Sequence, residues 1–427
     1  MSFKPYFLYT LCMSTGLTFA ASAAHQQHIP PMPVATQSQI PAPIIQAAEH
    51  LIHTEETPGL TIVYLQKGHK PTILSLGKTD YSPQAFDVTP KTRFEIGSLT
   101  KLFTGLLAAQ CVEQKRCALQ DPLAKHLAGL SLSEPLANTS LKNLLTHTSG
   151  LPALPTNFAP AQADNPYADY DLEQLKTYLP NATLQNPGHY SYSNIAYGIL
   201  GYALLQTLHQ SSQASPPQRL IDVMQTQILT PLQMQDTFFE DPESLKLTAL
   251  PHHMGQTASP WHFQDITAGA GALRSNGQDM ARFLEAQMRP EKSPLKASLQ
   301  RSQEILVSHS AQSPFGLGYG WHQMPIQNKT LYFHNGQTGG FNSFIGFDAQ
   351  RERGAVILSN SPKSVEHLGM ALVQPEIPAP ALTDLRRSEA DLARHTGRFQ
   401  LTPELIFTLE QHRGYLYAQL TGQPALK

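Results

Sequence analysis

The feature that most constrains this chain is a serine placed at the start of a helix that is apolar on nearly every side. A short alternating run over 94–96 ends at Gly97, and from Leu99 onward the residues are almost all apolar. Such a pattern predicts a buried helix. Ser98 stands at its N-terminus and Lys101 follows one turn later, so their side chains share a face. A lysine within a buried helix is costly unless it has a partner or a function.

Two interpretations of Ser98 and Lys101 follow from this spacing. In the first, Ser98 is a nucleophile and Lys101 takes its proton, because a hydroxyl is a weak nucleophile without an adjacent base. The N–H groups at the helix start would then stabilise developing negative charge. In the second, Ser98 caps the helix and the Lys101 side chain reaches solvent. Ser-x-x-Lys pairs are common by chance, so other motifs must decide.

A second motif lies over 187–201, where a Tyr-Ser-Asn triplet precedes an apolar helix that begins near Ile195. Tyr192, on a loop beside a buried lysine, is suited to relay a proton. The amide of Asn194 both donates and accepts hydrogen bonds, which suits a substrate that contains an amide. The alternative is a core tyrosine followed by an asparagine that caps the helix.

A third motif interrupts a predicted strand near the C-terminal end of the chain. The pattern predicts a strand over 330–334, a break over 335–340 and a second strand over 341–347. Gly336 allows the backbone edge to approach a ligand closely. An exposed edge there would offer the N–H of Gln337 as one half of an oxyanion hole. The alternative is a glycine-rich turn that binds nothing.

The N-terminus predicts export. Lys4 precedes an apolar run over 6–20, and Ala21-Ser22-Ala23 fits a signal-peptidase site. The run is too short to span a bilayer, and no later stretch is long enough. We therefore expect a signal peptide over 1–23, a periplasmic protein and no stable membrane insertion.

Composition and charge exclude some functions. The net charge is −2 without a long basic run, which argues against nucleic acid as a partner. His252 and His253 have no acidic or cysteine partner at ligand spacing, so we expect surface histidines, no metal site and no cofactor. Cys111 and Cys117 can form a local disulfide if the helix ends between them, but not within a continuous helix. Both alternatives remain open, and the oligomeric state is not predicted.

The domain organisation follows from changes in composition along the chain. Residues 24–42 are rich in Gln, Pro and Ala and predict a flexible leader. A catalytic domain over 43–373 follows, with a long loop over 153–170 of a kind often found near active sites. A proline-rich linker over 374–390 precedes a small β-module over 391–427, whose three strands we expect to pack on the catalytic domain.

Other segments have ordinary patterns. The sequence predicts helices over 43–53, 141–147 and 277–288 and strands over 59–66 and 72–77. The Gly/Ala-rich turn over 268–275 is expected to be scaffold.

In their order and spacing, the three motifs resemble the serine β-lactamase and penicillin-binding protein superfamily, in particular its class C branch. That branch includes class C β-lactamases, D-alanyl-D-alanine carboxypeptidases of the AmpH kind and family VIII esterases. The resemblance runs from about Pro43 to about Ser361, and 144–152 is also similar to a family segment. It implies an α+β fold: an antiparallel sheet flanked by helices, beside a mostly helical lobe, with the active site in the cleft between them.

The resemblance also implies roles for the motif residues. Ser98 would be the acylated nucleophile, and Lys101 and Tyr192 would share the proton transfers. Asn194 would hold the substrate amide. The N–H groups of Ser98 and Gln337 would form the oxyanion hole.

The third motif departs from the class C pattern. His334-Asn335-Gly336 stands where class C β-lactamases have Lys-Thr-Gly, and we expect these residues and Gln337 to bind substrate. A histidine there resembles DD-peptidases and several esterases and weakens the case for β-lactam hydrolysis. We favour a protonated His334 that pairs with a substrate carboxylate. The alternative is a neutral histidine packed beside the strand.

The first functional hypothesis is a D-Ala-D-Ala carboxypeptidase or endopeptidase that acts on peptidoglycan peptides. A class C β-lactamase and a family VIII carboxylesterase are the enzymatic alternatives. A β-lactam- or peptidoglycan-binding protein that is acylated without turnover is the non-enzymatic one.

Overall fold

The computed structural model describes residues 39–210, 219–240, 247–253, 255–310, 313, 315–326, 329–350, 352–380, 388–402, 405–412 and 415–420. The predicted signal peptide and most of the predicted leader lie outside these residues. The leader prediction is wrong for its last residues, because Ile40 is buried and helix α1, Ala42–His53, begins there. Ile40 packs in the same apolar cluster as Ile44 of this helix. Its burial explains why the chain is ordered before the predicted helix start.

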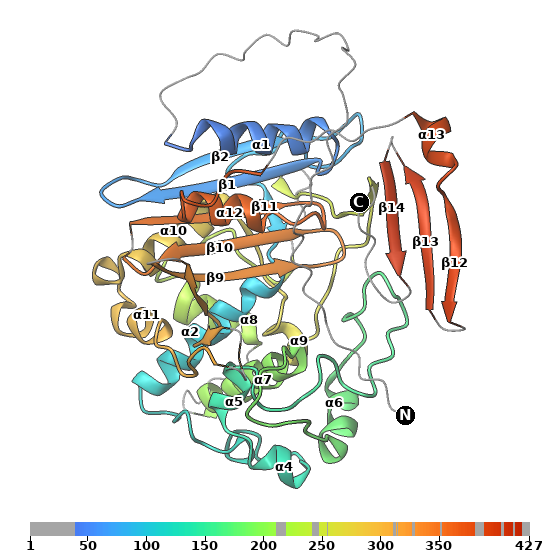
Figure 1. Ribbon diagram of the computed structural model, residues 1–427. Coiled ribbons are helices and arrows are strands. Elements are labelled where there is room, and N and C mark those ends of the chain that lie inside the picture. Colours follow the sequence, from blue (N-terminus) through green and yellow to red (C-terminus); the bar gives the residue numbers. More distant parts are fainter. Residues whose placement is uncertain are drawn as a thin grey trace. The chain divides into compact units, whose positions relative to one another are not determined.

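A seven-stranded antiparallel sheet forms the centre of the fold, in the order β2-β1-β11-β10-β9-β8-β7 (Figure 1). Strand β1, early in the chain, pairs with β11, late in the chain. The strands are β1 Gly59–Gln66, β2 Thr72–Gly77, β7 Gly316–Leu317, β8 His322–Ile326, β9 Lys329–Gln337, β10 Asn342–Asp348 and β11 Arg353–Ser359.

Helices cover both faces of this sheet. Helices α1 and α12, Glu366–Val373, pack on one face, and α10, Gly277–Met288, packs on the other (Figure 1). Because successive strand residues point to opposite faces, the sheet separates two cores. Ile62 and Ile357 belong to the core beneath α1 and α12, whereas their neighbours Val63 and Val356 belong to the larger core with α10.

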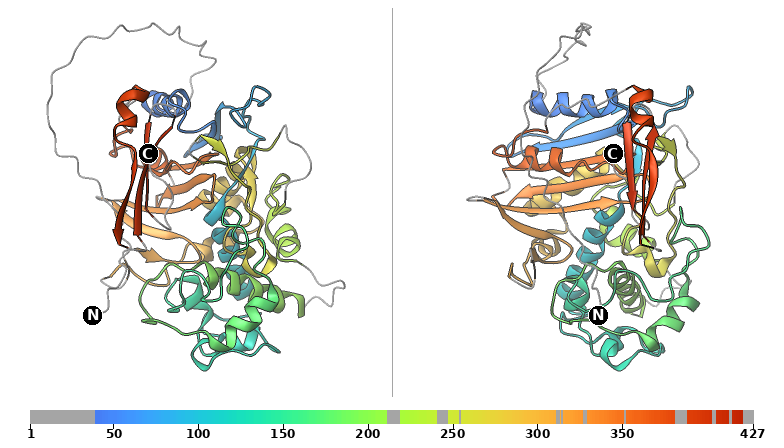
Figure 2. Two further views of the ribbon diagram at one scale, coloured as in Figure 1. Left: turned by 90° about the vertical axis from the view of Figure 1, so that its right-hand side faces the viewer. Right: turned by 45° about the vertical axis from the view of Figure 1, so that its right-hand side comes forward.

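A mostly helical part lies below β9 in the view of Figure 1, on the opposite side of the sheet's central strands from α1, and Figure 2 shows it from two further directions. Its central helices are α2, Thr100–Glu113, and α7, Asn194–Gln210, which pack against each other. The first twelve residues of α2 are all buried, as its apolar sequence predicts. The remaining short elements of the catalytic part are β3 Arg93–Glu95, η1 Gly97–Leu99, α3 Leu123–His126, α4 Glu134–Ala137, α5 Leu141–Leu145, α6 Leu172–Tyr178, η2 Leu179–Asn181, α8 Leu220–Met224, η3 Gln225–Leu229, β4 His252–His253, β5 Gln256–Thr257, α9 Asp265–Ala268, β6 Arg274–Asn276, η5 Pro290–Lys292 and α11 Lys296–Ser302.

The C-terminal segment forms a separate three-stranded antiparallel sheet. Helix α13, Glu389–Ala393, begins after Ser388, whose side chain accepts a hydrogen bond from the Asp391 N–H. Strands β12 Gly397–Thr402, β13 Leu405–His412 and β14 Tyr415–Leu420 follow and pair in chain order. The alternating pattern therefore predicted the strands correctly. The linker and the packing of this module stay predictions.

Several other expectations can be compared with the structure. The strands over 59–66 and 72–77 and the helix over 277–288 are confirmed, and the described chain has no helix or strand over 153–170. The break over 335–340 is wrong in its position. Strand β9 continues to Gln337, which pairs with Asn342, because β10 supports this stretch of strand along its whole length.

The two cysteines are joined in the structure. Helix α2 ends at Glu113, and the chain turns back so that the Cys117 N–H donates to the Cys111 carbonyl. The sulfur atoms form a disulfide, with the Cα atoms 5.5 Å apart. This is the alternative in which the helix ends between the cysteines.

The prediction that His252 and His253 both lie on the surface is wrong for His252. His252 is buried and its Nδ1 lies 2.8 Å from the Leu250 carbonyl, whereas His253 is partly exposed. Among the residues that the structure describes, no three His, Cys, Asp or Glu side chains gather as a metal site would require. None of the described helices has the length and apolar character needed to cross a membrane.

A buried ion pair joins β3, which precedes helix α2, to β6. Glu95 of β3 stands opposite Arg274 of β6, with Nη2 3.3 Å from Oε1 and both side chains less than 10% exposed. Glu95 also accepts from the Trp261 N–H, and Arg274 donates to the Trp261 carbonyl. The pair therefore fixes the segment around Trp261 against both strands.

Replacing Arg274 by alanine should lower the free energy of unfolding by about 3–5 kcal/mol, because it removes the guanidinium that pairs with the buried Glu95 carboxylate. Urea denaturation followed by circular dichroism measures this. The control is Lys78→Ala, which removes an ion pair with Asp87 in which both side chains are exposed and should barely move the midpoint. Equal small changes in both variants would show that the Glu95–Arg274 pair has no such role.

Candidate active site

Ser98 and Lys101 meet at the junction between the sheet and the helical part. Ser98 lies in the 3₁₀ turn η1, which leads into α2 beside strand β9. The Lys101 Nζ is 3.1 Å from the Ser98 Oγ, and the lysine is fully buried. Ser98 makes no side-chain cap on α2, and Lys101 does not reach solvent. The second interpretation, in which Ser98 caps the helix and the Lys101 side chain reaches solvent, is therefore wrong in both parts.

The hydrogen bonds of Lys101 can all be made by a neutral amine. Its Nζ lies 2.7 Å from the Ala270 carbonyl and 2.8 Å from the Asn194 Oδ1, and both of these oxygens can only accept. A neutral amine has two N–H groups for them and one lone pair, which is then left for the Ser98 hydroxyl. Burial holds the pKa of Lys101 well below its ordinary value of 10.5, which favours this neutral form. Lys101 is thus arranged to accept the Ser98 proton.

Tyr192 completes a directed chain of hydrogen bonds. Its hydroxyl donates to the Ser98 Oγ over 2.8 Å, which leaves the Ser98 hydrogen free to point at Lys101. Burial raises the pKa of the Tyr192 phenol well above its ordinary value of 10.0, so the phenol keeps its proton. The Lys101 Nζ also lies 4.9 Å from the centre of the Tyr192 ring. The three predicted catalytic side chains are therefore in direct contact.

Asn194 orients Lys101 from the first turn of α7. Its Oδ1 accepts from Lys101, and its Nδ2 donates to the Tyr167 hydroxyl over 3.0 Å. Tyr167 comes from the predicted long loop, and burial raises the pKa of this tyrosine to about 12. The helix cap is Ser193, whose Oγ accepts from the Ala196 N–H, and not Asn194. Binding of a substrate amide by Asn194 stays a prediction.

The edge of β9 offers backbone donors beside Ser98. Strand β8 pairs with β9 only as far as Phe333, and among the described residues no strand pairs with the following part of β9 on that side. A Cβ on Gly336 would lie 2.2 Å from the Ile96 carbonyl and 3.1 Å from the Ser98 nitrogen, so only glycine allows this approach. The Thr338 N–H donates to the carbonyl of Phe341, the residue before β10. Because N–H groups alternate along a strand, the Gln337 N–H points to the open edge.

The expectation of a charged His334 is contradicted. The side chain is 1% exposed, and its Nδ1 lies 2.6 Å from the Asn335 carbonyl, to which it must donate. The Nε2 atom is then an acceptor, and among the described residues it has no hydrogen-bond partner. Burial holds the pKa of His334 well below its ordinary value of 6.5, and His322, stacked 4.8 Å away, and Lys101 lower it further. His334 is therefore neutral.

The other residues of the third motif point in different directions. The Asn335 side chain is exposed and its Nδ2 donates to Glu366 of α12 over 3.2 Å. The structure therefore pairs Asn335 with α12, and no described contact joins its side chain to Ser98, Lys101 or Tyr192. The side chain of Gln337 is exposed as well.

Two residues of the site were missed by the sequence interpretation. Ala270 lies in the turn that was expected to be scaffold, yet its carbonyl accepts from Lys101. A backbone carbonyl has no signal in a sequence. His147 stacks on Tyr192, with ring centres 4.4 Å apart. The only signal for it was that 144–152 resembles a family segment.

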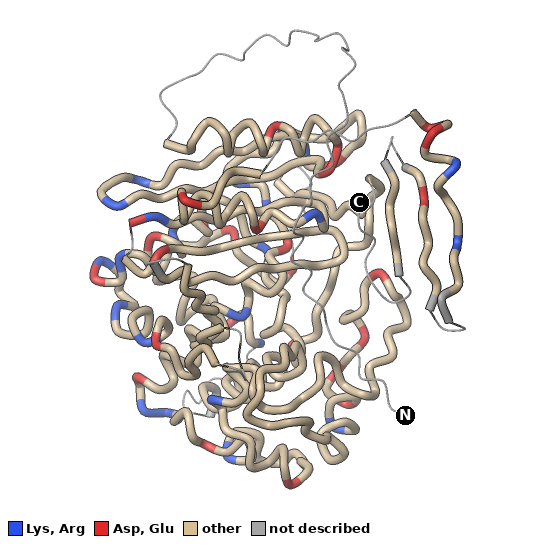
Figure 3. The backbone as a smooth tube through the Cα atoms, viewed as in Figure 1, with Lys and Arg blue, Asp and Glu red and all other residues tan. Residues whose placement is uncertain are grey.

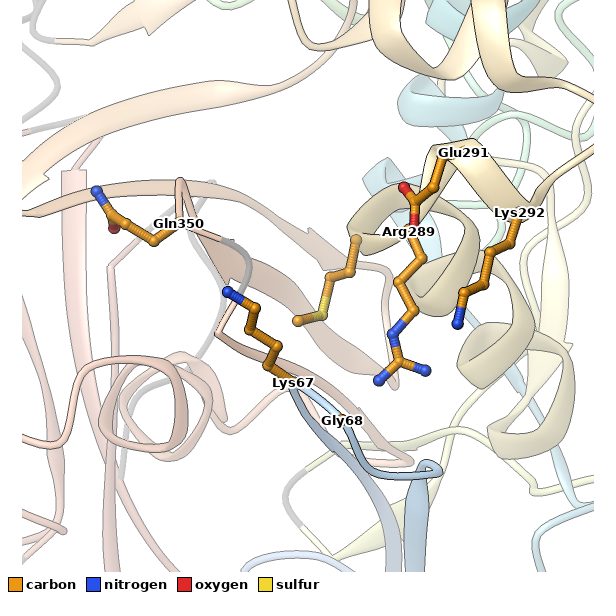
Figure 4. A pocket seen from close by; sticks show the side chains of 7 residues that line it. Lys67, Gly68, Arg289, Glu291, Lys292 and Gln350 are labelled. Atoms are coloured by element: carbon orange, nitrogen blue, oxygen red, sulfur yellow. The ribbon is translucent and has the colours of Figure 1, made fainter.

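Charge and surface shape do not single out a second site. Figure 3 shows basic and acidic residues of both signs scattered along the described chain. A hollow of about 370 Å³ is lined by Lys67, Arg289 and Lys292 among others (Figure 4). Arg289 already donates to Glu285 and to two backbone carbonyls. We therefore assign no ligand to this hollow.

Replacing Gln337 by proline should slow acylation about 10²–10³-fold, because proline removes the N–H expected to bind the oxyanion. This N–H is not part of the pairing with β10, so the strand tolerates proline there. Gln337→Ala, which keeps the N–H and removes only the exposed side chain, is the control. Stopped-flow acylation by a chromogenic β-lactam measures both, and equal rates in the two variants would exclude the Gln337 N–H from the mechanism.

Comparison with known proteins adds to this geometry. A family model described as Beta-lactamase matches residues 44–374. Protein flp of Staphylococcus aureus (strain MW2) is 26% identical over 341 residues, which cover 76% of this chain and 65% of that protein. A protein named Beta-lactamase from Pseudomonas fluorescens is 26% identical over 350 residues, which cover 73% of this chain and 91% of that protein. The chain thus spans less than two thirds of the length of flp.

Solved structures show the same fold. A class C β-lactamase from Rhodobacter sphaeroides aligns with a TM-score of 0.64 and 20% identity, covering 78% of this chain and 98% of that one. A mutant class C β-lactamase aligns with a TM-score of 0.65 and 20% identity, covering 78% and 94%. The α+β fold that the motifs imply is thereby confirmed. With the family model matched over 44–374, the chain belongs to the beta-lactamase family and has the fold of its class C members.

Proposed function

We propose that the protein is a serine acyl hydrolase that forms an acyl-enzyme at Ser98 and acts on peptidoglycan peptides that end in D-Ala-D-Ala. The observation that carries the proposal is the Ser98 Oγ, held 3.1 Å from the Lys101 Nζ and 2.8 Å from the Tyr192 hydroxyl. Membership of the beta-lactamase family supports the assignment of serine hydrolase activity. The D-Ala-D-Ala substrate rests on the histidine of the third motif, as in the DD-peptidases that the chain resembles.

The contacts give each side chain a step. The Ser98 Oγ attacks the substrate carbonyl carbon while its proton passes to the neutral Lys101 amine. The N–H groups of Ser98 and Gln337 bind the oxygen as it becomes negative. When the C–N bond breaks, the Tyr192 hydroxyl protonates the leaving amine. The proton held by Lys101 then passes to the Tyr192 oxygen and restores the phenol. Water then attacks the acyl-enzyme carbonyl, and its proton passes to the neutral Lys101 amine through the Tyr192 hydroxyl, which gives up one proton as it takes another. When the C–O bond to Ser98 breaks, Lys101 returns the proton to the Ser98 Oγ and the acid is released.

A neutral His334 favours a second candidate, a carboxylesterase. Where class C β-lactamases have a permanent cation, this chain has an uncharged hydrogen-bond acceptor. A substrate carboxylate therefore gains no ion pair with His334, whereas a neutral ester loses nothing. The same fact argues against efficient β-lactam hydrolysis. A D-Ala-D-Ala carboxylate would have to be bound by neutral donors such as backbone N–H groups.

The predicted compartment agrees with the proposed substrate. A signal peptide over 1–23 would deliver the chain to the periplasm, where peptidoglycan is present. The P. fluorescens relative is named Beta-lactamase, so a β-lactam belongs among the substrates to be tested.

Ser98→Ala should abolish covalent labelling by a fluorescent penicillin, because no other described side chain has the contacts of the Ser98 hydroxyl. The test compares turnover of a D-Ala-D-Ala peptide, a short-chain p-nitrophenyl ester and a cephalosporin by the wild type. Release of D-alanine that is lost in Ser98→Ala supports the peptidase. Ester turnover alone selects the carboxylesterase, cephalosporin turnover alone the β-lactamase, and labelling without turnover the binding protein. Labelling of the Ser98→Ala variant would contradict all four.

The pH dependence should not distinguish charged from uncharged substrates. Acylation by either kind should rise with pH as Lys101 loses its proton, and a neutral His334, whose pKa burial holds well below its ordinary value, adds no further change. Profiles for a penicillin and a neutral ester between about pH 5.5 and 8.5 should therefore run parallel. His334→Lys should raise penicillin acylation relative to ester acylation, and the neutral control His334→Gln should not. A fall for penicillin alone as the pH rises through about 6.5 would restore the charged His334.

A further inference from the structure

We infer that His147 is a positioning residue that holds the Tyr192 hydroxyl on Ser98, by binding the backbone on both sides of the tyrosine and stacking on its ring. The inference rests on the proposed function, because it assigns His147 a part in the proton transfers of Tyr192.

His147 accepts hydrogen bonds from the two residues that flank Tyr192. The Ser191 N–H donates to the His147 carbonyl over 2.8 Å. The Ser193 N–H donates to the His147 Nδ1 over 3.0 Å. A backbone N–H can only donate, so the Nδ1 carries no proton and the imidazole proton lies on Nε2. One residue therefore fixes the main chain immediately before and after Tyr192.

The imidazole also supports the tyrosine ring. His147 is buried and stacks on Tyr192 at 30°. It also contacts Tyr197, with ring centres 5.0 Å apart. The Tyr197 hydroxyl donates to the Leu145 carbonyl, so this ring is fixed as well. The imidazole thus contacts both the fixed ring of Tyr197 and the ring of Tyr192, and it limits rotation of the Tyr192 side chain.

The segment around His147 aligns the whole approach to Tyr192. The Gln185 N–H donates to the Gly150 carbonyl, and the Gly188 N–H donates to the Thr148 carbonyl. With the bonds to Ser191 and Ser193, the two segments are tied at four points. These hydrogen bonds therefore fix the position of the loop that carries Tyr192 against residues 147–150 and beside Ser98.

His147 has a backbone conformation that selects few residues. Its φ is 54°, in the left-handed region that favours glycine and is tolerated by Asn and His. Glycine would be easiest there, but it has neither an acceptor nor a ring. A side chain that is kept in spite of this backbone is consistent with a use for the imidazole.

A direct role in proton transfer is not part of the inference. Burial holds the pKa of His147 well below its ordinary value, and the neighbouring Lys101, His322 and His334 lower it further. The groups that face its ring are Tyr190, Tyr192 and Tyr197. A neutral imidazole in this place acts on Tyr192 by contact and not by charge.

The test is a double-mutant cycle between His147 and Tyr192. His147→Phe keeps a flat ring and removes the acceptor, and His147→Asn keeps an acceptor and tolerates the backbone conformation but removes the ring. Each is made in the wild type and in Tyr192→Phe, and the rate of acylation by a chromogenic penicillin and by a p-nitrophenyl ester is measured. Thermal unfolding checks that each variant is folded.

With Tyr192 present, His147→Phe should slow acylation about 10²-fold, the loss expected when a reacting group is displaced by about 1 Å. His147→Asn should slow acylation less than His147→Phe does. In the Tyr192→Phe background both changes should have almost no further effect, because residues that act as a unit are not additive. If His147→Phe does not fold, His147→Asn gives the same comparison.

Equal losses in the two backgrounds, or no loss in either, would overturn the inference and leave His147 a structural residue. The matched control is His126→Phe, a buried histidine bonded to Thr207 and Asp121 and away from Tyr192, whose effect should be the same in both backgrounds. If Tyr192→Phe alone leaves the acylation rate unchanged, the proposed role of Tyr192 in proton transfer is wrong. That result can be told apart from equal losses in the two backgrounds, which would contradict only the inference about His147.

Discussion

The site depends on one interaction, the burial of the Lys101 amine between two oxygens that can only accept. One oxygen belongs to Asn194 at the start of α7, and the other is the Ala270 carbonyl in the turn after α9. The amine therefore ties together three segments that are distant in the sequence. A buried cation at this place would be expensive, whereas a neutral amine with two donated bonds is fully satisfied and keeps its lone pair for Ser98. The same two hydrogen bonds thus hold the three segments together and orient the lysine for proton transfer.

The sheet and the helical part contribute different groups. The helical part and the loop before α7 supply the nucleophile and the groups that move protons, and β9 supplies backbone donors. This is possible because β8 stops at the partner of Phe333, and no strand that the structure describes pairs with the next four residues of β9 on that side. An unpaired edge is usually a liability. Here Gly336 allows the η1 turn to cover it, so the edge faces Ser98 rather than another sheet.

Most of the fold could be predicted because its patterns are local. The burial of α2 and the strands over 59–66 and 72–77 follow from runs of apolar residues, and Ser98, Lys101 and Tyr192 follow from motifs with fixed spacing. Other features depend on tertiary contacts. The charge of His334 is decided by the ring of His322 stacked on it and by burial, neither of which is visible in one segment. The Ala270 carbonyl is invisible for a different reason, since every residue has one.

The pairing of β1 with β11 determines when this fold can form. Thr57 and Ser359 are 302 residues apart in the sequence, and their hydroxyl oxygens lie 2.8 Å apart. The helical part and its active site are contained within this loop. Until the chain has been made as far as Ser359, the β1–β2 hairpin has one open edge and the central strands of the sheet are missing. Such high contact order slows folding and leaves an early strand waiting for a late partner, so a nascent chain depends on being kept apart from other copies until its last central strand arrives.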